Sequence, residues 1–521
     1  MLKRKLPIGG VQTFNGLRKD YDVYVDKTAS IYDLASRYKT VFLSRPRRFG
    51  KSLLCSTIES LFRNQKDNFI ELAISNTDWK WKEHPVIHLE LAGCDYTENG
   101  ISVLINSLND QLDKVCQNYE INIERNEFLE SRFSRIITEL SFKFDQVVII
   151  IDEYDNPLFN TFNLPEQNSK IREKLKGFYS VIKQCDQYIR FTFITGVTKF
   201  SQVSVFSGMN QAKDISMMSE YSDICGITQN ELETYFSYEI EAYAPRYGGK
   251  NNYLDKLKTY YDGYCFTKDK KSVYNIYGVL NHFDNSAEFT PFWSMSGAPS
   301  FLLKFLEMKN ENIVEIEEAS MKAANFGDYK DNIITLYPLL YQAGYLTISD
   351  YNENTGLFKL TYPNTEVRQT LAQFLMINYS KSDNNTSFSV SNQLIKSLID
   401  GKPDDFMNLL KIYLSKVDYS LSSKITEYYF EFAVSNIINL LGLKCKNEVH
   451  TSNGRMDSVI FAGNYIYILE FKVDKPLKNT FSQFAEKEYS MIYRDSGKTI
   501  LEIGIIFNRK KRNIVNWGIK S

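Results

Sequence analysis

The chain contains little cysteine, histidine, glycine or proline. Its 521 residues include seven cysteines, none of them in C-x-x-C spacing, and four histidines. A structural zinc site needs clustered Cys or His ligands, so the sequence excludes one. An odd number of scattered cysteines fits buried thiols in a reducing cytosol better than a disulfide framework. The 25 glycines and 12 prolines predict a chain built mostly from regular helices and strands.

Long apolar runs and an excess of one charge are also absent. No stretch approaches the ~20 apolar residues of a membrane-spanning helix, and the segment Leu6–Gly10 is too short and broken for a signal-peptide core. We therefore expect a cytoplasmic protein with no membrane partner. Lys and Arg total 62 against 63 Asp and Glu. This balance excludes a basic coat over the whole chain, although local basic grooves remain compatible with it.

The apolar content is high enough for about three domains. Hydrophobic residues make up 43% of the chain and charged residues 24%, and a domain usually takes roughly 100–200 residues. Residues 1–240 alternate short apolar runs with amphipathic stretches, which predicts an α/β domain with a parallel sheet. Residues 241–414 are mainly helical, and residues 415–521 show a helix, two strands, a helix and a strand. The Asn- and Ser-rich stretch Ser380–Ser389 is a candidate boundary.

The residue ranges of individual strands and helices can be predicted in the N-terminal region and in part of the middle region. Strands are predicted at Thr40–Ser44, Pro85–Leu91, Val147–Asp152 and Ile189–Thr195, with helices around 51–63, 99–119, 126–141 and 168–185. In the middle region, Leu336–Tyr345 reads as a helix that leads into a hairpin of Leu346–Ile348 and Leu357–Leu360. A helix followed by a hairpin is a faint winged-helix-like pattern, and such an element could help to hold DNA.

A phosphate-binding loop is predicted between the first strand and its helix. The segment Ser44-Arg45-Pro46-Arg47-Arg48-Phe49-Gly50-Lys51-Ser52 matches G-x-x-x-x-G-K-[ST] except that Arg45 replaces the first glycine. Backbone N–H groups at the start of the helix can hold phosphates, Lys51 can neutralise their charge, and the Ser52 hydroxyl can ligate Mg²⁺. The expected ATP-binding residues are Arg48, Phe49, Gly50, Lys51, Ser52 and Leu53. A basic loop before an ordinary helix is the alternative.

Adjacent acids at the end of a buried strand strengthen this interpretation. The run Val147–Ile151 is followed by Asp152 and Glu153, where Asp152 could hold the metal and Glu153 could act as general base toward a water. Asp152 could instead cap the next segment. Thr195, at the end of a neighbouring strand, could sense a γ-phosphate or belong to a turn that uses Gly196. The side chains of Arg45, Arg47 and Arg48 could touch phosphate, a neighbouring subunit or solvent, and we assign them no catalytic role.

These segments resemble the bacterial AAA-ATPase-like family, whose usual phosphate loop is Ser-Arg-Pro-Arg-Arg-Phe-Gly-Lys-Ser. The resemblance is carried by Tyr24–Thr28, Leu43–Leu53, Ile151–Asp155, Thr195–Val197, Tyr261–Tyr264 and Gly344–Leu346. It covers roughly residues 5–300 and implies an AAA-like fold that binds ATP with Mg²⁺.

A second site is predicted near the C-terminal end. Asp457 begins one strand, and after a turn the strand Tyr465–Lys472 carries Glu470 and Lys472 on one face. Two carboxylates can bind Mg²⁺, which polarises a phosphate and activates water, while Lys472 can stabilise charge or orient the nucleophile. The alternative is a set of solvated or salt-bridged strand charges. Upstream, Glu427 and Glu431 lie at i,i+4 on a helix, and Glu427 could complete the metal site.

This second pattern resembles the PD-(D/E)xK nuclease superfamily over roughly residues 415–521. Asp457, Glu470 and Lys472 match its motif, Glu427 matches its helix glutamate, and Gln483, Lys487 and Tyr489 resemble its downstream helix motif. The basic run Arg509–Arg512 could contact backbone phosphates or simply form a solvated loop.

Together, these observations predict an ATP-binding, ATP-hydrolysing protein with a Mg²⁺-dependent nuclease-like domain. Its expected partners are ATP and either DNA or RNA, and a homo-oligomer is compatible with the sequence. The alternative is a nucleotide-switched interaction or scaffold protein whose nuclease-like domain does not cut.

Overall fold

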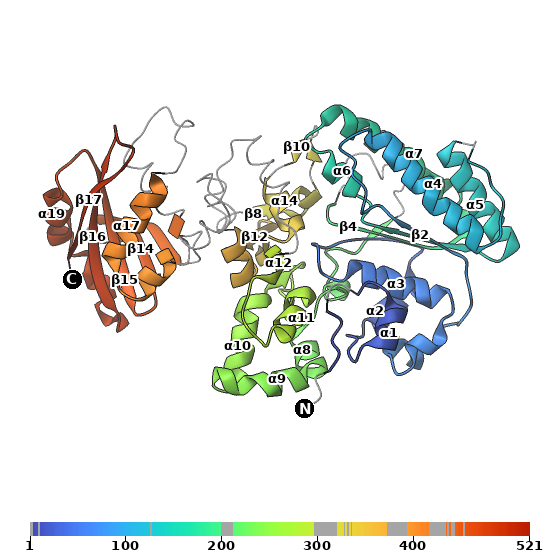
Figure 1. The fold of residues 1–521 in the computed structure, drawn as a ribbon, viewed down its shortest axis with the longest axis horizontal. Coiled ribbons are helices and arrows are strands. Elements are labelled where there is room, and N and C mark those ends of the chain that lie inside the picture. The colour runs from blue at the N-terminus through green and yellow to red at the C-terminus, as the bar shows by residue number, and fades with distance from the viewer. Residues whose placement is uncertain are drawn as a thin grey trace. The chain divides into compact units, whose positions relative to one another are not determined.

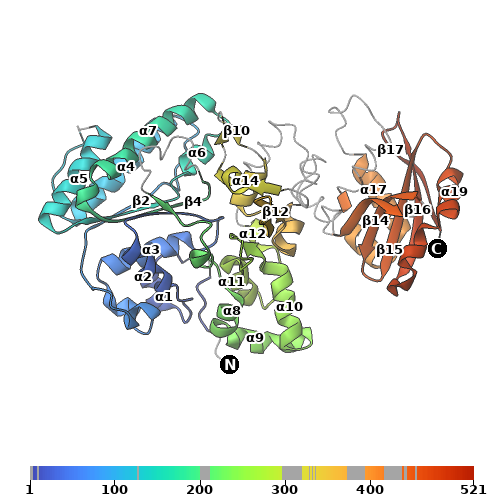
Figure 2. The same ribbon diagram turned by 180° about the vertical axis from the view of Figure 1, so that it is seen from behind.

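The computed structural model divides the chain into two compact units, residues 1–364 (unit 1) and 365–521 (unit 2) (Figures 1 and 2). The structure describes residues 4–8, 11–125, 128–199, 212–295, 320–327, 329–330, 333–334, 336–371, 393–415, 434, 437–438, 443–451 and 454–520.

Unit 1 is built on a five-stranded parallel sheet. Its strands are β1 (Thr40–Ser44), β2 (Val86–Glu90), β3 (Val147–Asp152), β4 (Ile189–Gly196) and β5 (Lys213–Asp214), in the order β2-β3-β4-β1-β5. The four predicted strands are confirmed, because their continuous apolar runs are buried between layers on both faces of the sheet. All five carboxyl ends therefore meet at one edge, where open α/β sheets bind ligands.

Helices cover both faces of this sheet (Figure 1). One face carries α4 (Gly100–Asn118), α5 (Leu129–Lys143) and α7 (Pro165–Gln184), whose buried side chains share a core with β2, β3 and β4. The other carries α1 (Phe14–Asp20), α2 (Thr28–Arg37) and α3 (Lys51–Phe62), and a short α6 (Asn156–Asn160) follows β3. All four predicted helices are confirmed. The helix expected from 168 begins at Pro165, because proline is well suited to the first helical turn.

A mainly helical region follows the sheet, as predicted. It contains α8 (Gln229–Tyr235), α9 (Ser237–Tyr243), α10 (Lys250–Tyr261), β6 (Tyr264–Cys265), β7 (Ser272–Val273), α11 (Ile276–Asp284) and α12 (Phe292–Met295). Its core is rich in tyrosine and phenylalanine and includes the buried residues Phe236, Tyr253, Tyr261 and Phe283.

A buried histidine in this core makes the stability of unit 1 sensitive to pH. His282 Nδ1 donates a hydrogen bond to the Glu288 carbonyl (3.1 Å), and Nε2 lies 2.7 Å from Tyr253 Oη, which donates to it when the ring is neutral. Burial lowers the pKa of His282 to about 4, so between pH 6.5 and 4 the unfolded chain takes up a proton that the folded chain does not. We expect unit 1 to lose about 3 kcal/mol of stability across that window, measured by denaturant unfolding. In the double variant His282→Phe and Tyr253→Phe this pH dependence should flatten; an unchanged profile would contradict the assignment.

The predicted helix and hairpin of the middle region are present. They are α14 (Leu336–Ala343), β11 (Thr347–Asn352) and β12 (Leu357–Thr361), and β8 (Ser320–Lys322) extends the hairpin to an antiparallel sheet in the order β11-β12-β8. The pair β9 (Tyr329–Lys330) and β10 (Ile333–Ile334) lies nearby in sequence. The helix stops before Tyr345 because Gly344 adopts a left-handed backbone (φ +89°), which is common just after a helix.

Unit 2 is a five-stranded mixed sheet between two helical layers. The strands are β13 (Lys444–Thr451), β14 (Gly454–Ala462), β15 (Tyr465–Val473), β16 (Thr499–Asn508) and β17 (Asn513–Lys520), hydrogen-bonded in chain order. Only the pair β15 and β16 is parallel. One face packs against α17 (Pro403–Leu414) and the other against α19 (Lys478–Lys487). The predicted Glu427, its neighbour Glu431 and the boundary Ser380–Ser389 lie outside the described residues.

The sequence predicted neither a membrane-spanning helix nor a disulfide framework. No helix among the described residues is long and apolar enough to cross a membrane. The structure describes the side chains of six of the seven cysteines, all except Cys445, and these six form no disulfide.

Candidate ATP-binding and nuclease-like sites

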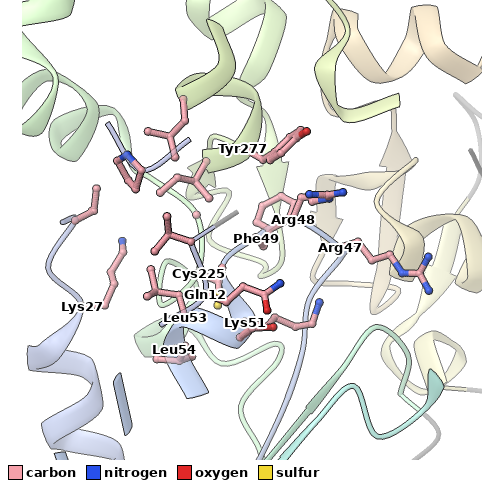
Figure 3. A pocket seen from close by; sticks show the side chains of 18 of the residues that line it. Gln12, Lys27, Arg47, Arg48, Phe49, Lys51, Leu53, Leu54, Cys225 and Tyr277 are labelled. Atoms are coloured by element: carbon pink, nitrogen blue, oxygen red, sulfur yellow. The ribbon is translucent and has the colours of Figure 1, made fainter. Parts of the chain in front are cut away.

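The predicted phosphate loop lies at the carboxyl edge of the unit 1 sheet, between β1 and α3. Gly50 is the N-cap of α3 and has a left-handed backbone (φ +88°), as does Arg48 (φ +71°). The loop opens on a cavity of about 480 Å³ (Figure 3). All six residues that we expected to bind ATP line this cavity: Arg48, Phe49, Gly50, Lys51, Ser52 and Leu53. The loop and the helix start therefore present their groups to one space.

Lys51 occupies the first turn of α3 and is only 4% exposed. Its Nζ donates a hydrogen bond to the Pro46 carbonyl across the loop at 3.2 Å. The first N–H groups of a helix have no partner within the helix, and together with the helix dipole they favour an anion at this end. A buried ammonium beside these N–H groups is suited to a phosphate.

The two acids at the carboxyl end of β3 take different positions: Asp152 is the last residue of the strand, and Glu153 follows it at the cavity. Asp152 is buried and hydrogen-bonds to the Ser52 side chain, while Glu153 lines the cavity wall. Burial raises the pKa of Asp152, and its hydrogen bond with Ser52 and the charge of Lys51 oppose that rise. Glu153 has a left-handed backbone (φ +50°), and its N–H donates to Asp152 Oδ1 at 2.9 Å. The structure thus brings Lys51, Ser52, Asp152 and Glu153 to one edge.

Arg45 is buried inside unit 1, which contradicts the solvent-exposed alternative for this residue. Its guanidinium is 1% exposed and donates to the carbonyls of Ser44 (2.9 Å), Ser216 (2.8 Å) and Tyr221 (3.1 Å). It also stacks on the Phe266 ring, 4.1 Å from its centroid. The residue in the usual glycine position therefore ties the loop to two other segments of unit 1. Arg47 and Arg48 line the cavity instead.

Further contacts hold the loop against the helical region. The Phe49 ring is 1% exposed and packs edge-on against Tyr264 (4.7 Å) and Phe266 (5.6 Å). The Arg48 guanidinium lies over the Tyr277 ring of α11 at 4.5 Å (Figure 3). The cavity is consequently shared between the sheet domain and the helices that follow it.

Asp155, two residues after Glu153, has a structural role that the sequence did not suggest. It is 1% exposed and accepts hydrogen bonds from the N–H groups of Val197 and Thr198. A Cβ on Gly196 would lie 2.5 Å from Asp155 Oδ1, so only glycine fits there. Asp155 joins the ends of β3 and β4.

Thr195 itself is fully buried and is not among the side chains lining the cavity. Among the described residues its Oγ1 has no hydrogen-bond partner. Thr195 and Gly196 are the last two residues of β4, at the carboxyl edge of the sheet, and the sensing of a γ-phosphate by Thr195 stays a prediction.

Other residues of the cavity carried no motif and were missed. They come from the N-terminal segment, from the loop before α8 and from α11, and include Pro7, Ile8, Val11, Gln12, Cys225, Gly226, Tyr277, Leu280 and Asn281. Most are apolar, which suits the base and sugar of a nucleotide better than its phosphates.

In unit 2, the predicted acids and lysine converge at one end of the sheet. Asp457 on β14 accepts a hydrogen bond from the Phe471 N–H of β15 at 2.8 Å, which places its carboxylate beside Glu470. Lys472 Nζ donates to Glu470 Oε1, also at 2.8 Å. Glu470 is fully buried, and Asp457 is 7% exposed. Such burial contradicts the alternative of solvated strand charges, whereas the ion pair between Lys472 and Glu470 fits the salt-bridged alternative as well as a metal site.

The helix α19 lies over the same face of the sheet. Along β15, Tyr467, Leu469 and Phe471 belong to the core on the α17 side, whereas Ile466 and Ile468 pack with Phe484 and Tyr489 on the α19 side. Glu470 and Lys472 continue the second series. Gln483 Nε2 donates to Tyr489 Oη at 3.2 Å. Burial raises the pKa of Tyr489, and the charges of Glu470 and Asp457 add to that rise, so Tyr489 lies close to both carboxylates. Lys487 lies in the last turn of α19.

The oxygen donors of both sites suit Mg²⁺, which prefers one or two carboxylates and completes its shell with water and phosphate oxygens. Ser52 and Asp152 are already in contact in unit 1, and Asp457 and Glu470 are neighbours in unit 2. No group of three or more His, Cys, Asp or Glu side chains is arranged around a metal position in the part of the chain that the structure describes.

Comparisons with known proteins agree with these two units. Residues 7–206 match the family model described as predicted AAA-ATPase, and residues 425–517 match that of the PD-(D/E)XK nuclease superfamily. The "uncharacterized protein in vnfD 5′ region" of Azotobacter chroococcum mcd 1 is 31% identical over 537 residues, covering 100% of both chains.

Two solved structures are more distant. The Aeropyrum pernix ORC2 protein (ADPNP–ADP complexes) has a TM-score of 0.30 at 11% identity and covers 70% of this chain and 98% of its own. The Aeropyrum pernix ORC1 protein in complex with DNA has a TM-score of 0.26 at 9% identity, covering 69% and 96%. The chain belongs to the predicted AAA-ATPase family, and its C-terminal part is a domain of the PD-(D/E)XK nuclease superfamily.

Proposed function

We propose that unit 1 binds and hydrolyses ATP in the cavity at the phosphate loop. The observation that carries this half is the contact of Ser52 with the buried Asp152, with Lys51 and Glu153 facing the same cavity. Lys51 and the first N–H groups of α3 would hold the β- and γ-phosphates, and Ser52 and Asp152 would hold Mg²⁺. The ion would supply charge neutralisation at the phosphates. Glu153 would accept the proton of the attacking water.

Changing Glu153→Gln separates binding from hydrolysis. We expect ATP affinity to stay within about threefold, because the phosphate-binding groups are untouched, and turnover to fall by about a hundredfold or more, because the general base is lost. Affinity can be measured with a fluorescent ATP analogue and turnover by phosphate release. Glu90→Gln is the matched control, since Glu90 is the register neighbour of Asp152 at the end of β2 and does not line the cavity. Equal turnover in the two variants would argue against a catalytic Glu153.

We further propose that unit 2 is a Mg²⁺-dependent nuclease that cleaves phosphodiester bonds of DNA or RNA. This half is carried by the placement of the Asp457 carboxylate beside Glu470, with Lys472 Nζ on the Glu470 carboxylate. Asp457 and Glu470 would hold the metal, which polarises the phosphate and lowers the pKa of a bound water. Lys472 would stabilise charge on the phosphate oxygens or orient the water. ATP binding in unit 1 would regulate this cleavage.

The decisive experiment is a cleavage assay on the full chain. Single-stranded, duplex and supercoiled DNA, and RNA, would be incubated with Mg²⁺ or EDTA, each with and without ATP. Mg²⁺-dependent cleavage whose rate changes with ATP would support both halves and their coupling. Cleavage that ignores ATP would support the nuclease and contradict the coupling. Absence of cleavage of all four substrates, with ATP still bound, would favour the alternative of a nucleotide-switched scaffold protein.

A further inference from the structure

The turn between β16 and β17 carries four consecutive basic residues, Arg509, Lys510, Lys511 and Arg512, and all four are exposed. It lies at the end of the sheet that holds the nuclease-like site. Strands β15 and β16 are parallel, with Lys472 opposite Ile506, so the turn begins three residues beyond the level of Lys472. At about 3.3 Å per residue this is about 10 Å from the site, the span of about three phosphates along one DNA strand.

Hydrogen bonds hold this turn to the strand that carries the site. Asp474, two residues after Lys472, accepts from Asn508 Nδ2 (2.9 Å) and from the Arg509 N–H (3.2 Å), and its own N–H donates to the Phe507 carbonyl (2.9 Å). Asp474 adopts a left-handed backbone (φ +54°), and so does Arg512 (φ +51°). The basic turn is thus fixed in position relative to Glu470 and Lys472, as a substrate-guiding element has to be.

Charge is also distributed unevenly between the two units. Unit 2 (residues 365–521) contains 21 Lys and Arg against 16 Asp and Glu, and 14 against 8 of these lie in residues 443–520, whereas unit 1 (residues 1–364) contains 41 against 47. Two further exposed lysines, Lys475 and Lys478, follow β15 at the same end of the sheet. The near-zero net charge of the chain therefore hides a basic C-terminal domain, and half of the 14 cations in residues 443–520 lie at the end of the sheet that holds the site: Lys472, Lys475, Lys478 and Arg509–Arg512.

We propose that the basic turn Arg509–Arg512 is a binding surface for the phosphate backbone of the nucleic acid. The bound phosphates would belong either to the strand that is cut at Asp457 and Glu470 or to the strand beside it. This inference rests on the proposed nuclease function. Exposed ammonium and guanidinium groups bind backbone phosphates without reading sequence, and each such contact contributes to the salt dependence of binding. The turn would position substrate and take no part in the chemical step.

The test measures binding separately from cutting. Fluorescein-labelled single-stranded DNA, duplex DNA and RNA of equal length would be titrated with the full chain in EDTA, by anisotropy, over a series of salt concentrations. The variant Lys510→Gln/Lys511→Gln should bind about tenfold more weakly at 0.15 M salt, with the slope of log affinity against log salt reduced by between one and two. The matched control is Arg494→Gln/Lys498→Gln, which removes two exposed cations at the opposite end of β16 and should change neither quantity.

Each outcome decides the proposal. Equal affinities and slopes for the two double variants, or no binding of any of the three probes by the unaltered chain, would overturn it. The substrate type that shows the largest difference identifies whether the turn follows DNA or RNA. The nuclease function is judged separately: if the turn variant weakens binding but the unaltered chain never cleaves with Mg²⁺, the surface stands and the catalytic proposal fails. If cleavage depends on Asp457 while the turn variant binds nucleic acid as tightly as the unaltered chain, the catalytic proposal stands and the proposed binding surface fails.

Discussion

Substituting Asp457→Asn is expected to lower Mg²⁺-dependent cleavage by about a thousandfold. Asparagine has the same shape and can still accept the hydrogen bond that the Phe471 N–H donates to Asp457 Oδ2, so the strand geometry should persist. The substitution removes one of two carboxylates available to a divalent cation, and a metal contributes several kcal/mol to stabilising charge at a phosphate. The rate is measured at saturating substrate, with Mg²⁺ varied, so that weaker metal binding and slower chemistry can be separated.

The control for this substitution is Glu486→Gln. Glu486 is an exposed acid on α19, the helix that covers the same face of the sheet, so its loss changes the net charge of the domain equally without touching the site. Its cleavage rate should match that of the unaltered chain. Thermal unfolding of both variants would show whether either change alters folding. If Asp457→Asn cleaves at the normal rate while folded, the carboxylate does not hold a catalytic metal.

Sequence patterns predicted well those helices and strands whose conformation is determined by their own residues. The strands at Thr40–Ser44 and Val147–Asp152 agree to the residue, because a short apolar run buried on both faces has no alternative place in an α/β fold. The edge strands β13 and β17 were missed. Their segments, such as Lys444–Thr451, mix polar and apolar residues and become strands only through pairing with β14 and β16. Propensity is weak where the neighbouring strand decides the structure.

The residues of the candidate sites also divide into those that a local pattern predicts and those that depend on distant parts of the chain. Residues that belong to a local motif, such as Lys51 with Ser52 and Glu470 with Lys472, can be found in the sequence because the chemistry demands a fixed spacing. Arg45 could not be assigned, because its partners Ser216, Tyr221 and Phe266 are more than 170 residues away. The apolar wall of the cavity has no motif at all, since any well-shaped apolar side chain could line it.

The largest effect on nucleotide binding is expected from Lys51→Ala. The ammonium is 4% exposed and is held over the loop by the Pro46 carbonyl, so it is already placed before a phosphate enters. Losing a charge-assisted hydrogen bond at a buried position costs about 1.5–3 kcal/mol, which corresponds to a roughly 10- to 150-fold weaker ATP affinity. Hydrolysis should fall further, because the charge of Lys51 also opposes the burial that raises the pKa of Asp152. A more protonated Asp152 would hold a cation less well.

The same cavity provides the control for this substitution. Lys27 also lines it (Figure 3), but its Nζ is neutralised by Glu231 at 2.6 and 2.7 Å, so Lys27→Gln should change ATP affinity by less than about threefold. Isothermal titration with ATP and Mg²⁺ gives both affinities, and phosphate release gives both rates. If ATP binds Lys51→Ala as tightly as the unaltered chain, the loop does not hold the phosphates and the nucleotide site must be sought elsewhere. If both lysine variants weaken ATP equally, the effect is one of general charge in the cavity, and the specific role of Lys51 in the phosphate loop is contradicted.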